Sequence, residues 1–285
     1  MQTTTLGRTG LTVSQLGFGG APAGLTNYLS TYAPENVDQR QQVLAALETA
    51  LALGITYFDT AADYGDGASE RIFGEGLARA GDNIVLATKV SSRMVARASV
   101  ERSLRNLRRD RLDVVQIHGT VYHPEKADAI LASGGLLDQL LALKEEGLVR
   151  YIGFTTEASN AAVDRFVADG RFDVMQIAYN LLYQHPYDPV RPFGSIIDAD
   201  QQQMGVITMR TLTSGLLQKW IQQVNPHNSF DYTPALLQFV LSNPLVDVAL
   251  VGMRTPAEVQ ANVAIWGDLA GRIDLDWLHE RYVDK

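Results

Sequence analysis

The sequence contains no cysteine, and this absence excludes several kinds of chemistry. Without thiols the chain cannot form disulfides, attack a substrate through a thiolate, or bind zinc or an iron–sulfur cluster through cysteine. Its histidines and carboxylates show no metal-ligand spacing, and the Gly-x-Ser-x-Gly elbow of many hydrolases is missing. We therefore predict a protein with no metal site.

Long apolar runs and a leader segment are missing as well. No stretch of about 18 uncharged apolar residues occurs, so the sequence predicts no transmembrane helix and no membrane partner. Residues 1–5 lack the basic region and the apolar run of a signal peptide. Because disulfides are absent too, we expect a cytoplasmic protein.

Basic residues are in the minority, with 24 Lys and Arg against 32 Asp and Glu and a formal net charge of −8. An excess of negative charge disfavours binding to nucleic acid. The densest arginine segment, residues 102–111, has helical spacing and is typical of a solvated helix face. We therefore expect no nucleic-acid partner.

The composition is otherwise that of an ordinary globular protein. Hydrophobic residues make up 46% and charged residues 20% of the 285 positions, which is enough to bury a large core. This length allows one or two domains, and a (β/α)₈ barrel commonly needs about 250 residues. No linker or low-complexity tract divides the chain, so we predict one domain over residues 1–285.

Short apolar segments alternate with segments of helical spacing along the chain. Such alternation implies parallel strands joined by right-handed crossovers. The predicted strands are residues 16–20, 55–59, 84–89, 112–118, 149–154, 173–178, 204–209 and 247–251. The predicted helices are residues 34–53, 69–80, 95–109, 134–146, 157–169, 195–203, 234–243 and 256–266.

Two α/β architectures are compatible with this order: a closed (β/α)₈ TIM barrel and an open, doubly wound sheet. The open sheet should carry a G-x-G-x-x-G phosphate fingerprint after its first strand. Neither residues 17–20 nor residues 74–76 complete this pattern. The sequence therefore favours the barrel.

Both ends of the chain carry short predicted elements. Residues 3–7 and 11–14 predict a hairpin around an Arg-Thr-Gly turn. Residues 274–285 predict an amphipathic helix, whose apolar side would hold Leu275, Leu278 and Tyr282.

Ionisable residues follow three successive strands. Asp59, Lys89 and His118 end the apolar segments 55–59, 84–89 and 112–118, and Tyr64 follows five residues after Asp59. The carboxyl ends of parallel barrel strands meet at one face, where barrel enzymes place their active sites. We therefore expect these four side chains to lie together.

The four residues resemble the Asp, Tyr, Lys and His tetrad of the aldo-keto reductase family. The resemblance extends over nearly the whole chain, and its other motifs are residues 8–14, 16–20, 147–153 and 258–262. It implies a (β/α)₈ barrel whose N-terminal hairpin closes the bottom. It also implies an NAD(P)-dependent oxidoreductase in which the nicotinamide carries the hydride.

Carbonyl reduction by hydride leaves an alkoxide that needs a proton, and the tetrad can supply one. A free tyrosine has a pKa of about 10, and a nearby ammonium lowers that pKa by favouring the phenolate. Tyr64 would thus be the general acid/base, Lys89 the perturbing cation and Asp59 its partner. His118 would hydrogen-bond the substrate oxygen and orient the carbonyl.

Taken singly, each of these residues has an ordinary structural explanation. Asp59 is as suitable for capping a helix or turn as for catalysis. Tyr64 alone would pack with a solvated hydroxyl, Lys89 alone would be exposed, and His118 alone would be a hydrogen-bonded structural residue. Their joint position at the ends of successive strands favours catalysis.

The resemblance also implies residues around the nicotinamide. Gln176 matches a glutamine that family members use against the carboxamide. Thr155 and Thr156 replace the Ser-Asn pair of many members, and both can donate and accept hydrogen bonds. Met209 stands where many members stack a tyrosine on the ring, although ordinary core packing also explains a methionine there.

The rest of the implied cofactor site follows the last two strands. A pyrophosphate would lie against Arg210, Leu212, Ser214 and Gly215, since barrels often bind phosphate near strands seven and eight. The closing motif would contribute Gly252, Arg254, Glu258 and Asn262, with Arg254 on a 2′-phosphate and Asn262 on the adenine. We expect NADP, but because a carboxylate at Glu258 repels a phosphate or accepts from an unphosphorylated ribose, NAD stays possible.

The expected reaction interconverts an aldehyde, ketone or sugar hemiacetal with the corresponding alcohol or lactone. One alternative is an NAD-linked aldose or lactol dehydrogenase that works mainly in the oxidative direction. Another is a nicotinamide-binding regulatory subunit with vestigial catalysis. The identity of the small-molecule substrate and the oligomeric state are not indicated by the sequence.

Overall fold

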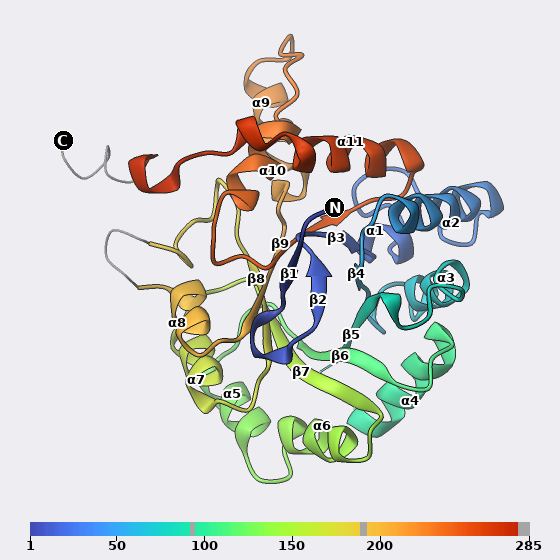
Figure 1. The fold of residues 1–285 in the computed structure, drawn as a ribbon, viewed down its shortest axis with the longest axis vertical. Coiled ribbons are helices and arrows are strands. Elements are labelled where there is room, and N and C mark those ends of the chain that lie inside the picture. The colour runs from blue at the N-terminus through green and yellow to red at the C-terminus, as the bar shows by residue number, and fades with distance from the viewer. Residues whose placement is uncertain (92–94, 189–192, 279–285) are drawn as a thin grey trace.

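Eight parallel strands close into a barrel at the centre of the molecule, in a computed structural model that describes residues 1–91, 95–188 and 193–278 (Figure 1). Their order around the barrel is β10-β3-β4-β5-β6-β7-β8-β9, which confirms the predicted (β/α)₈ TIM barrel. The strands are β3 (Leu16–Gly19), β4 (Tyr57–Asp59), β5 (Val85–Ser91), β6 (Leu112–His118), β7 (Val149–Thr156), β8 (Val174–Ala178), β9 (Gly205–Met209) and β10 (Val248–Gly252).

Helices follow the strands and surround the barrel, as the alternation predicts. They are α2 (Val37–Ala52), α3 (Ala68–Gly76), α4 (Ala96–Leu107), α6 (Leu136–Glu145), α7 (Ala161–Asp169), α8 (Ser195–Gln201), α10 (Thr233–Leu241) and α11 (Pro256–Gly267). Within the described residues no helix is both long and apolar enough to span a bilayer.

Helix starts differ from the predicted ones where an asparagine caps the first turn. Helix α2 begins after Asn36, whose side chain accepts the N–H of Gln39, and not at residue 34. Helix α7 begins after Asn160, which accepts two N–H groups of the first turn, and not at residue 157. An asparagine at this position satisfies backbone donors that the helix itself leaves unpaired.

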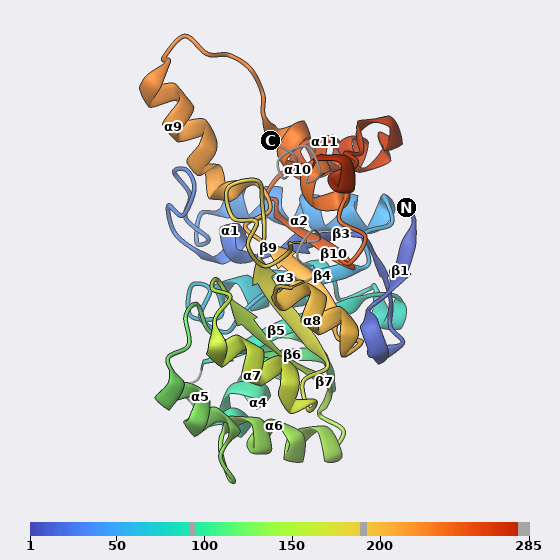
Figure 2. The same ribbon diagram turned by 90° about the vertical axis from the view of Figure 1, so that its left-hand side faces the viewer.

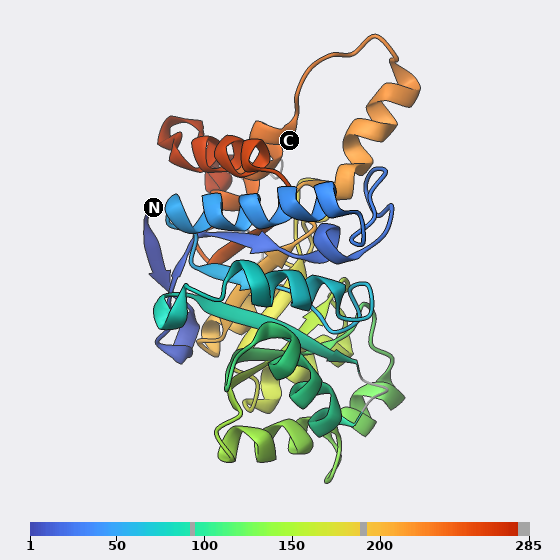
Figure 3. The same cartoon turned by 90° about the vertical axis from the view of Figure 1, so that its right-hand side faces the viewer.

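Three further helices lie in segments after strands, where no helix was predicted. They are α1 (Ala21–Gly24), α5 (Pro124–Leu131) and α9 (Leu216–Val224). Helix α9 and the loop after it stand away from the barrel in Figures 2 and 3. At the C-terminus, residues 275–278 are helical as predicted, whereas Tyr282 and the rest of 279–285 lie outside the described residues.

The barrel interior has its own hydrophobic core, separate from the larger one between strands and helices. Strands β1 (Thr3–Thr5) and β2 (Thr12–Ser14) pair antiparallel, as the predicted hairpin requires. Their segment inserts Leu6, Leu11 and Val13 among inward-facing strand residues, which include Tyr57, Val85, Val114, Val174 and Val248. The hairpin therefore closes one end of the barrel, and α1 and α9 lie at the other end (Figures 2 and 3).

Carboxylates at the closed end each accept a hydrogen bond from a backbone N–H of a neighbouring strand. Asp113 accepts from Leu86, Asp173 from Ile152 and Asp247 from Val206, at 3.0, 2.9 and 2.9 Å. Arg150 pairs with Asp113 and Lys144 with Asp173, but no ion pair with Asp247 occurs among the described residues. Burial therefore raises the pKa of Asp247 to about 6.

We predict that Asp247→Asn weakens the pH dependence of stability. The pKa of Asp247 is raised from 3.8 to about 6 in the folded protein. The folded state therefore binds this proton more tightly than the unfolded state does. Protonation of Asp247 thus stabilises the protein at low pH, and this stabilisation is lost as the pH rises through 6. Relative to the variant, the wild-type free energy of unfolding should fall by about 1–3 kcal/mol between pH 4 and 7. Urea unfolding across this range measures it, and parallel curves for the two proteins would contradict the assignment.

Candidate active site

Three residues from strands, Asp59, Lys89 and His118, meet the loop residue Tyr64 at the open end of the barrel. Lys89 Nζ lies 2.5 Å from Asp59 Oδ1 and 5.0 Å from the centre of the Tyr64 ring. The His118 ring stands edge-on to Tyr64, with centroids 5.7 Å apart. Strand register explains the meeting, because Asp59 is paired with Ala87 and Lys89 follows two residues later on the same face.

Lys89 and Asp59 form an ion pair inside the barrel, with side chains 1% and 2% exposed. Lys89 also donates to the carbonyl oxygen of Thr60 at 2.8 Å. Burial lowers the pKa of Lys89, but Asp59 and Tyr64 outweigh it and the pKa is raised. The lysine is therefore a permanent positive charge next to the Tyr64 ring.

Tyr64 keeps its hydroxyl hydrogen at neutral pH. Burial raises its pKa above the ordinary value of 10.0, and the charge of Lys89 only partly opposes this shift. The sequence led us to expect a lowered pKa, because the desolvation of the ring could not be seen there. The hydroxyl therefore stays protonated and has a hydrogen that it can donate.

His118 makes a contact that the sequence did not indicate. Its Nδ1 lies 3.3 Å from Oδ2 of Asp63, a residue of the loop after β4. Burial and the charge of Lys89 lower the pKa of His118 to about 4, and Asp63 only partly opposes them. The imidazole is therefore neutral at neutral pH.

Gln116 lies between Asp59 of the ion pair and Gln176, the residue expected to bind the nicotinamide carboxamide. Its Nε2 donates to Asp59 Oδ2 at 3.2 Å and to Gln176 Oε1 at 2.9 Å, and Gln176 in turn contacts the Met209 sulfur at 3.7 Å. Gln116 lies two residues before His118 on the same face of β6, and it was not among the predicted site residues. The available signal was a polar residue on the inward face of a strand, because a buried amide needs hydrogen-bond partners.

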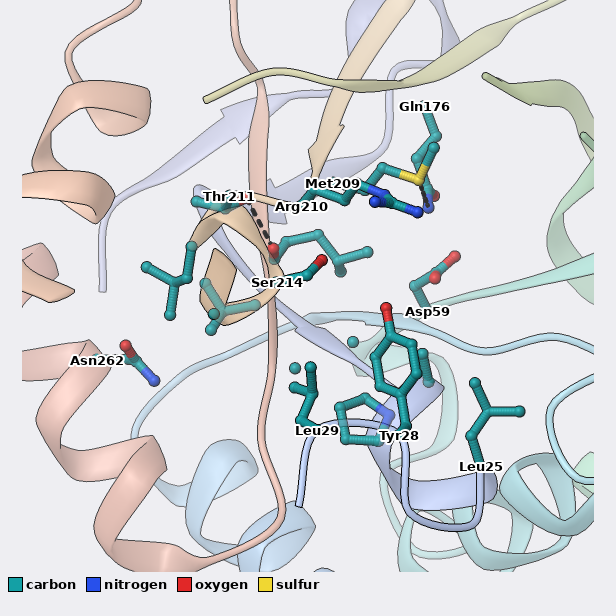
Figure 4. Close-up of a pocket in the computed structure, with 18 of the residues that line it drawn as sticks. Leu25, Tyr28, Leu29, Asp59, Gln176, Met209, Arg210, Thr211, Ser214 and Asn262 are labelled. Atoms are coloured by element: carbon teal, nitrogen blue, oxygen red, sulfur yellow. Dashed lines mark hydrogen bonds between the residues drawn. The ribbon is translucent and has the colours of Figure 1, made fainter. Parts of the chain in front are cut away.

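A cavity of about 650 Å³ opens beside the four residues (Figure 4). The predicted cofactor residues that line it come from the ends of β7, β8, β9 and β10 and the segments after them. These residues are Thr155, Gln176, Met209, Arg210, Leu212, Ser214, Gly215, Gly252, Glu258 and Asn262. Figure 4 shows Asp59, Gln176 and Met209 at one side and Asn262 at the other.

Two predicted cofactor residues point elsewhere. The Thr156 hydroxyl donates to the carbonyl oxygens of Thr120 and Ala158, so it stabilises the loop after β7. Arg254 donates to Ser30 Oγ at 2.5 Å, and its guanidinium lies 4.7 Å from the centre of the Tyr32 ring. Both were assigned from their sequence positions, which do not fix side-chain direction.

Glu258 has a structural task at the start of α11. Its Oε2 accepts the N–H groups of Arg254 and Thr255 at 2.6 and 3.0 Å, and Thr255 Oγ1 accepts the N–H of Glu258 at 3.2 Å. This is a capping box, which satisfies donors at the helix start. The carboxylate is thereby fixed where it lines the cavity.

Polar groups in the cavity wall suit a dinucleotide. Asn262 donates to the carbonyl oxygen of Glu258 at 2.9 Å, while its buried Oδ1 has no partner among the described residues and could accept from an adenine amino group. Thr213, Ser214 and Gly215 have positive φ angles of 55°, 51° and 74°. Such strain in two non-glycine residues is typical of ligand-binding loops.

Comparison with known proteins points to one family. A sequence model described as "Aldo/keto reductase family" matches residues 15–236. The chain is 30% identical to L-galactose dehydrogenase of Arabidopsis thaliana, with 91% of this chain and 86% of that protein covered.

Solved structures give the same fold. The aldo-keto reductase AKR11C1 from Bacillus halodurans, in its holo form, superposes with a TM-score of 0.74 at 22% identity, covering 97% of this chain and 93% of the other. An aldo-keto reductase from Klebsiella pneumoniae in complex with NADPH gives 0.71 at 22%, covering 98% and 94%.

We predict that Gln116→Leu destabilises the protein by about 1–3 kcal/mol, because Asp59 Oδ2 and Gln176 Oε1 lose a buried donor. Urea unfolding provides the measurement. The exposed Gln202 serves as a control, and Gln202→Leu should change stability by no more than about 0.5 kcal/mol. Equal stability of the two variants would show that the Gln116 bonds contribute nothing net.

Proposed function

Because the chain belongs to the aldo/keto reductase family, we propose that its cavity binds NAD(P) and that Tyr64 is the general acid/base of a carbonyl–alcohol interconversion. The substrates would be an aldehyde, ketone or sugar hemiacetal, and the products the corresponding alcohol or lactone. The observation that carries the proposal is the buried, charged Lys89 held between Asp59 and the Tyr64 ring. One domain, residues 1–285, would contain the whole site.

When bound, the nicotinamide supplies or takes up the hydride. In reduction, the Tyr64 hydroxyl donates its proton to the oxygen that becomes the alcohol. The ammonium of Lys89 stabilises the phenolate that remains, and Asp59 keeps that ammonium charged and in place. In oxidation the same groups act in reverse, with the phenolate taking the hydroxyl proton.

NADP is the proposed cofactor, with NAD possible. The solved Klebsiella pneumoniae relative contains NADPH, which supports a nicotinamide dinucleotide in this fold. Gln176 would bind the carboxamide, Met209 would pack on the ring, residues 210–215 would hold the pyrophosphate and Asn262 would accept from the adenine. The partnerless Oδ1 of Asn262 supports the last of these assignments.

A dehydrogenase that uses NAD to oxidise a sugar is the second candidate. The similarity to L-galactose dehydrogenase supports it. The carboxylate of Glu258, fixed in the cavity wall while Arg254 is engaged by Ser30 and Tyr32, also favours a cofactor without a 2′-phosphate.

We predict that Tyr64→Phe abolishes turnover and leaves cofactor binding intact, because the variant lacks the proton donor but keeps the dinucleotide site. The rate should fall by about 10²- to 10⁴-fold. Titration of tryptophan fluorescence with NADPH and with NADH should give micromolar binding of at least one cofactor to both proteins. Unchanged turnover would exclude Tyr64 as the acid/base, and no binding of either cofactor to folded wild-type protein would exclude the proposed function.

We predict that Glu258→Arg raises the affinity for NADPH relative to NADH by about tenfold, since a guanidinium attracts the 2′-phosphate that a carboxylate repels. Glu258→Gln is the matched control, because it removes the charge and retains a side-chain acceptor for the capping box. It should shift the ratio by less. A ratio that stays constant in both variants would place the adenosine away from the start of α11.

A further inference from the structure

Gln116 is a polar residue inside the barrel. It lies on β6 and is fully buried, and it is not one of the residues that line the cavity, so it does not face the space where a cofactor or substrate would bind. Its side-chain oxygen has no partner among the described residues. The amide is therefore held by the two hydrogens of its Nε2 alone.

One of these hydrogens goes to Asp59. Nε2 lies 3.2 Å from Oδ2 of Asp59, whose other oxygen lies 2.5 Å from Lys89 Nζ. A carboxylate paired with an ammonium only accepts hydrogen bonds, so the nitrogen of the amide, and not its oxygen, must face Asp59. The ion pair thereby fixes the orientation of the Gln116 amide.

The other hydrogen goes to Gln176. Nε2 lies 2.9 Å from Oε1 of Gln176, a residue of β8 that lines the cavity and contacts the Met209 sulfur. Gln116 belongs to β6, whereas its two partners belong to β4 and β8, and neither of these strands is next to β6 in the barrel. The amide therefore connects three strands across the barrel interior.

A glycine leaves the space for this connection. Gly153 is paired with Gln116 in the register of β6 and β7. A Cβ at Gly153 would lie only 3.2 Å from Gln116 Cγ and 2.7 Å from the carbonyl oxygen of Val174. Strand β7 thus has no side chain at the position where Gln116 passes from β6 toward β8.

We propose that Gln116 is a positioning residue, which holds Gln176 in place for the nicotinamide and anchors it on the ion pair. This inference rests on the proposed function and adds a residue to the same site. Hydride and proton must reach adjacent atoms of one carbonyl group, and small errors in their placement cost much of the rate. The cation beside Tyr64 and the residue expected at the nicotinamide then belong to one chain of contacts, formed by Lys89, Asp59, Gln116 and Gln176.

Gln116→Met tests the inference, because methionine fills a similar volume and cannot donate a hydrogen bond. Calorimetry compares two ligands: the oxidised form of the preferred cofactor, NADP⁺ or NAD⁺, and the same molecule without its nicotinamide, 2′-phospho-ADP-ribose or ADP-ribose. In the variant the affinity for the cofactor should fall by about fivefold, since Gln176 without its donor is no longer held in the bound position. The affinity for the fragment should stay that of the wild-type protein.

The ratio of the two affinities separates positioning from a general loss of structure, because a loosened barrel changes both affinities by the same factor. Gln238→Met is the matched control. Gln238 is 4% exposed and also donates twice, to the carbonyl oxygens of Ile265 and Asp268 at 2.8 and 2.9 Å, but it does not line the cavity. This variant should keep the wild-type ratio, whereas Gln116→Leu should lower it as Gln116→Met does.

A second comparison tests whether Gln116 acts through Gln176. Gln176→Met alone should lower the ratio of cofactor affinity to fragment affinity. Adding Gln116→Met to this variant should lower the ratio no further, because the residue to be positioned is already gone. A further fall in the double variant would overturn the inference.

The remaining outcomes separate the inference from the function on which it rests. A wild-type ratio retained in both Gln116 variants would overturn the inference and leave the cofactor site standing. Wild-type protein that binds the fragment as tightly as the cofactor would also overturn it, since no nicotinamide would then rest on Gln176. Folded wild-type protein that binds neither ligand would overturn the proposed function, and the inference with it.

Discussion

The ion pair of Lys89 and Asp59 is the interaction on which the site depends. Removing two charges from water costs several kcal/mol for each ion, and their attraction compensates only when the remaining polar atoms are satisfied as well. Here the carbonyl oxygen of Thr60 takes a lysine hydrogen and the Gln116 amide donates to the second carboxylate oxygen. Strands β4, β5 and β6 must therefore be in register before either charge can be accommodated.

The two ends of the barrel use carboxylates in different ways. At the closed end Asp113 and Asp173 hold backbone N–H groups and are neutralised by basic partners, so they stabilise the strands. At the open end Asp59 is paired with Lys89 and Asp63 contacts His118, so each carboxylate lies against a second side chain of the candidate site. The same chemical group stabilises strands at one end and positions the side chains of the candidate site at the other.

The sequence predicted the barrel and the meeting of Asp59, Lys89 and His118 because both follow from periodicity, which determines which face of a strand each side chain occupies. Tyr64, a loop residue, was found by its spacing from Asp59 and by resemblance. It could not predict that Arg254 would contact Tyr32 or that Asp63 would reach His118, since these contacts depend on loop conformation. No helix was predicted at Leu216–Val224, the segment after β9 that forms α9. The direction of the Tyr64 pKa shift was also missed, because it is the balance of burial against one charge and requires coordinates.

The hairpin that closes the barrel joins the beginning of the chain to its middle and end. Thr9 accepts from the Tyr151 hydroxyl at 2.5 Å, the N–H of Arg8 reaches the carbonyl oxygen of Gln203, and Leu6 packs against Val248 in the interior core. Contacts between residues so distant in sequence cost much conformational entropy, because a long loop must be closed. They therefore form late in folding. The hairpin residues are thus among the last to find their partners, and until they do the interior core lacks the apolar side chains that cover it at this end.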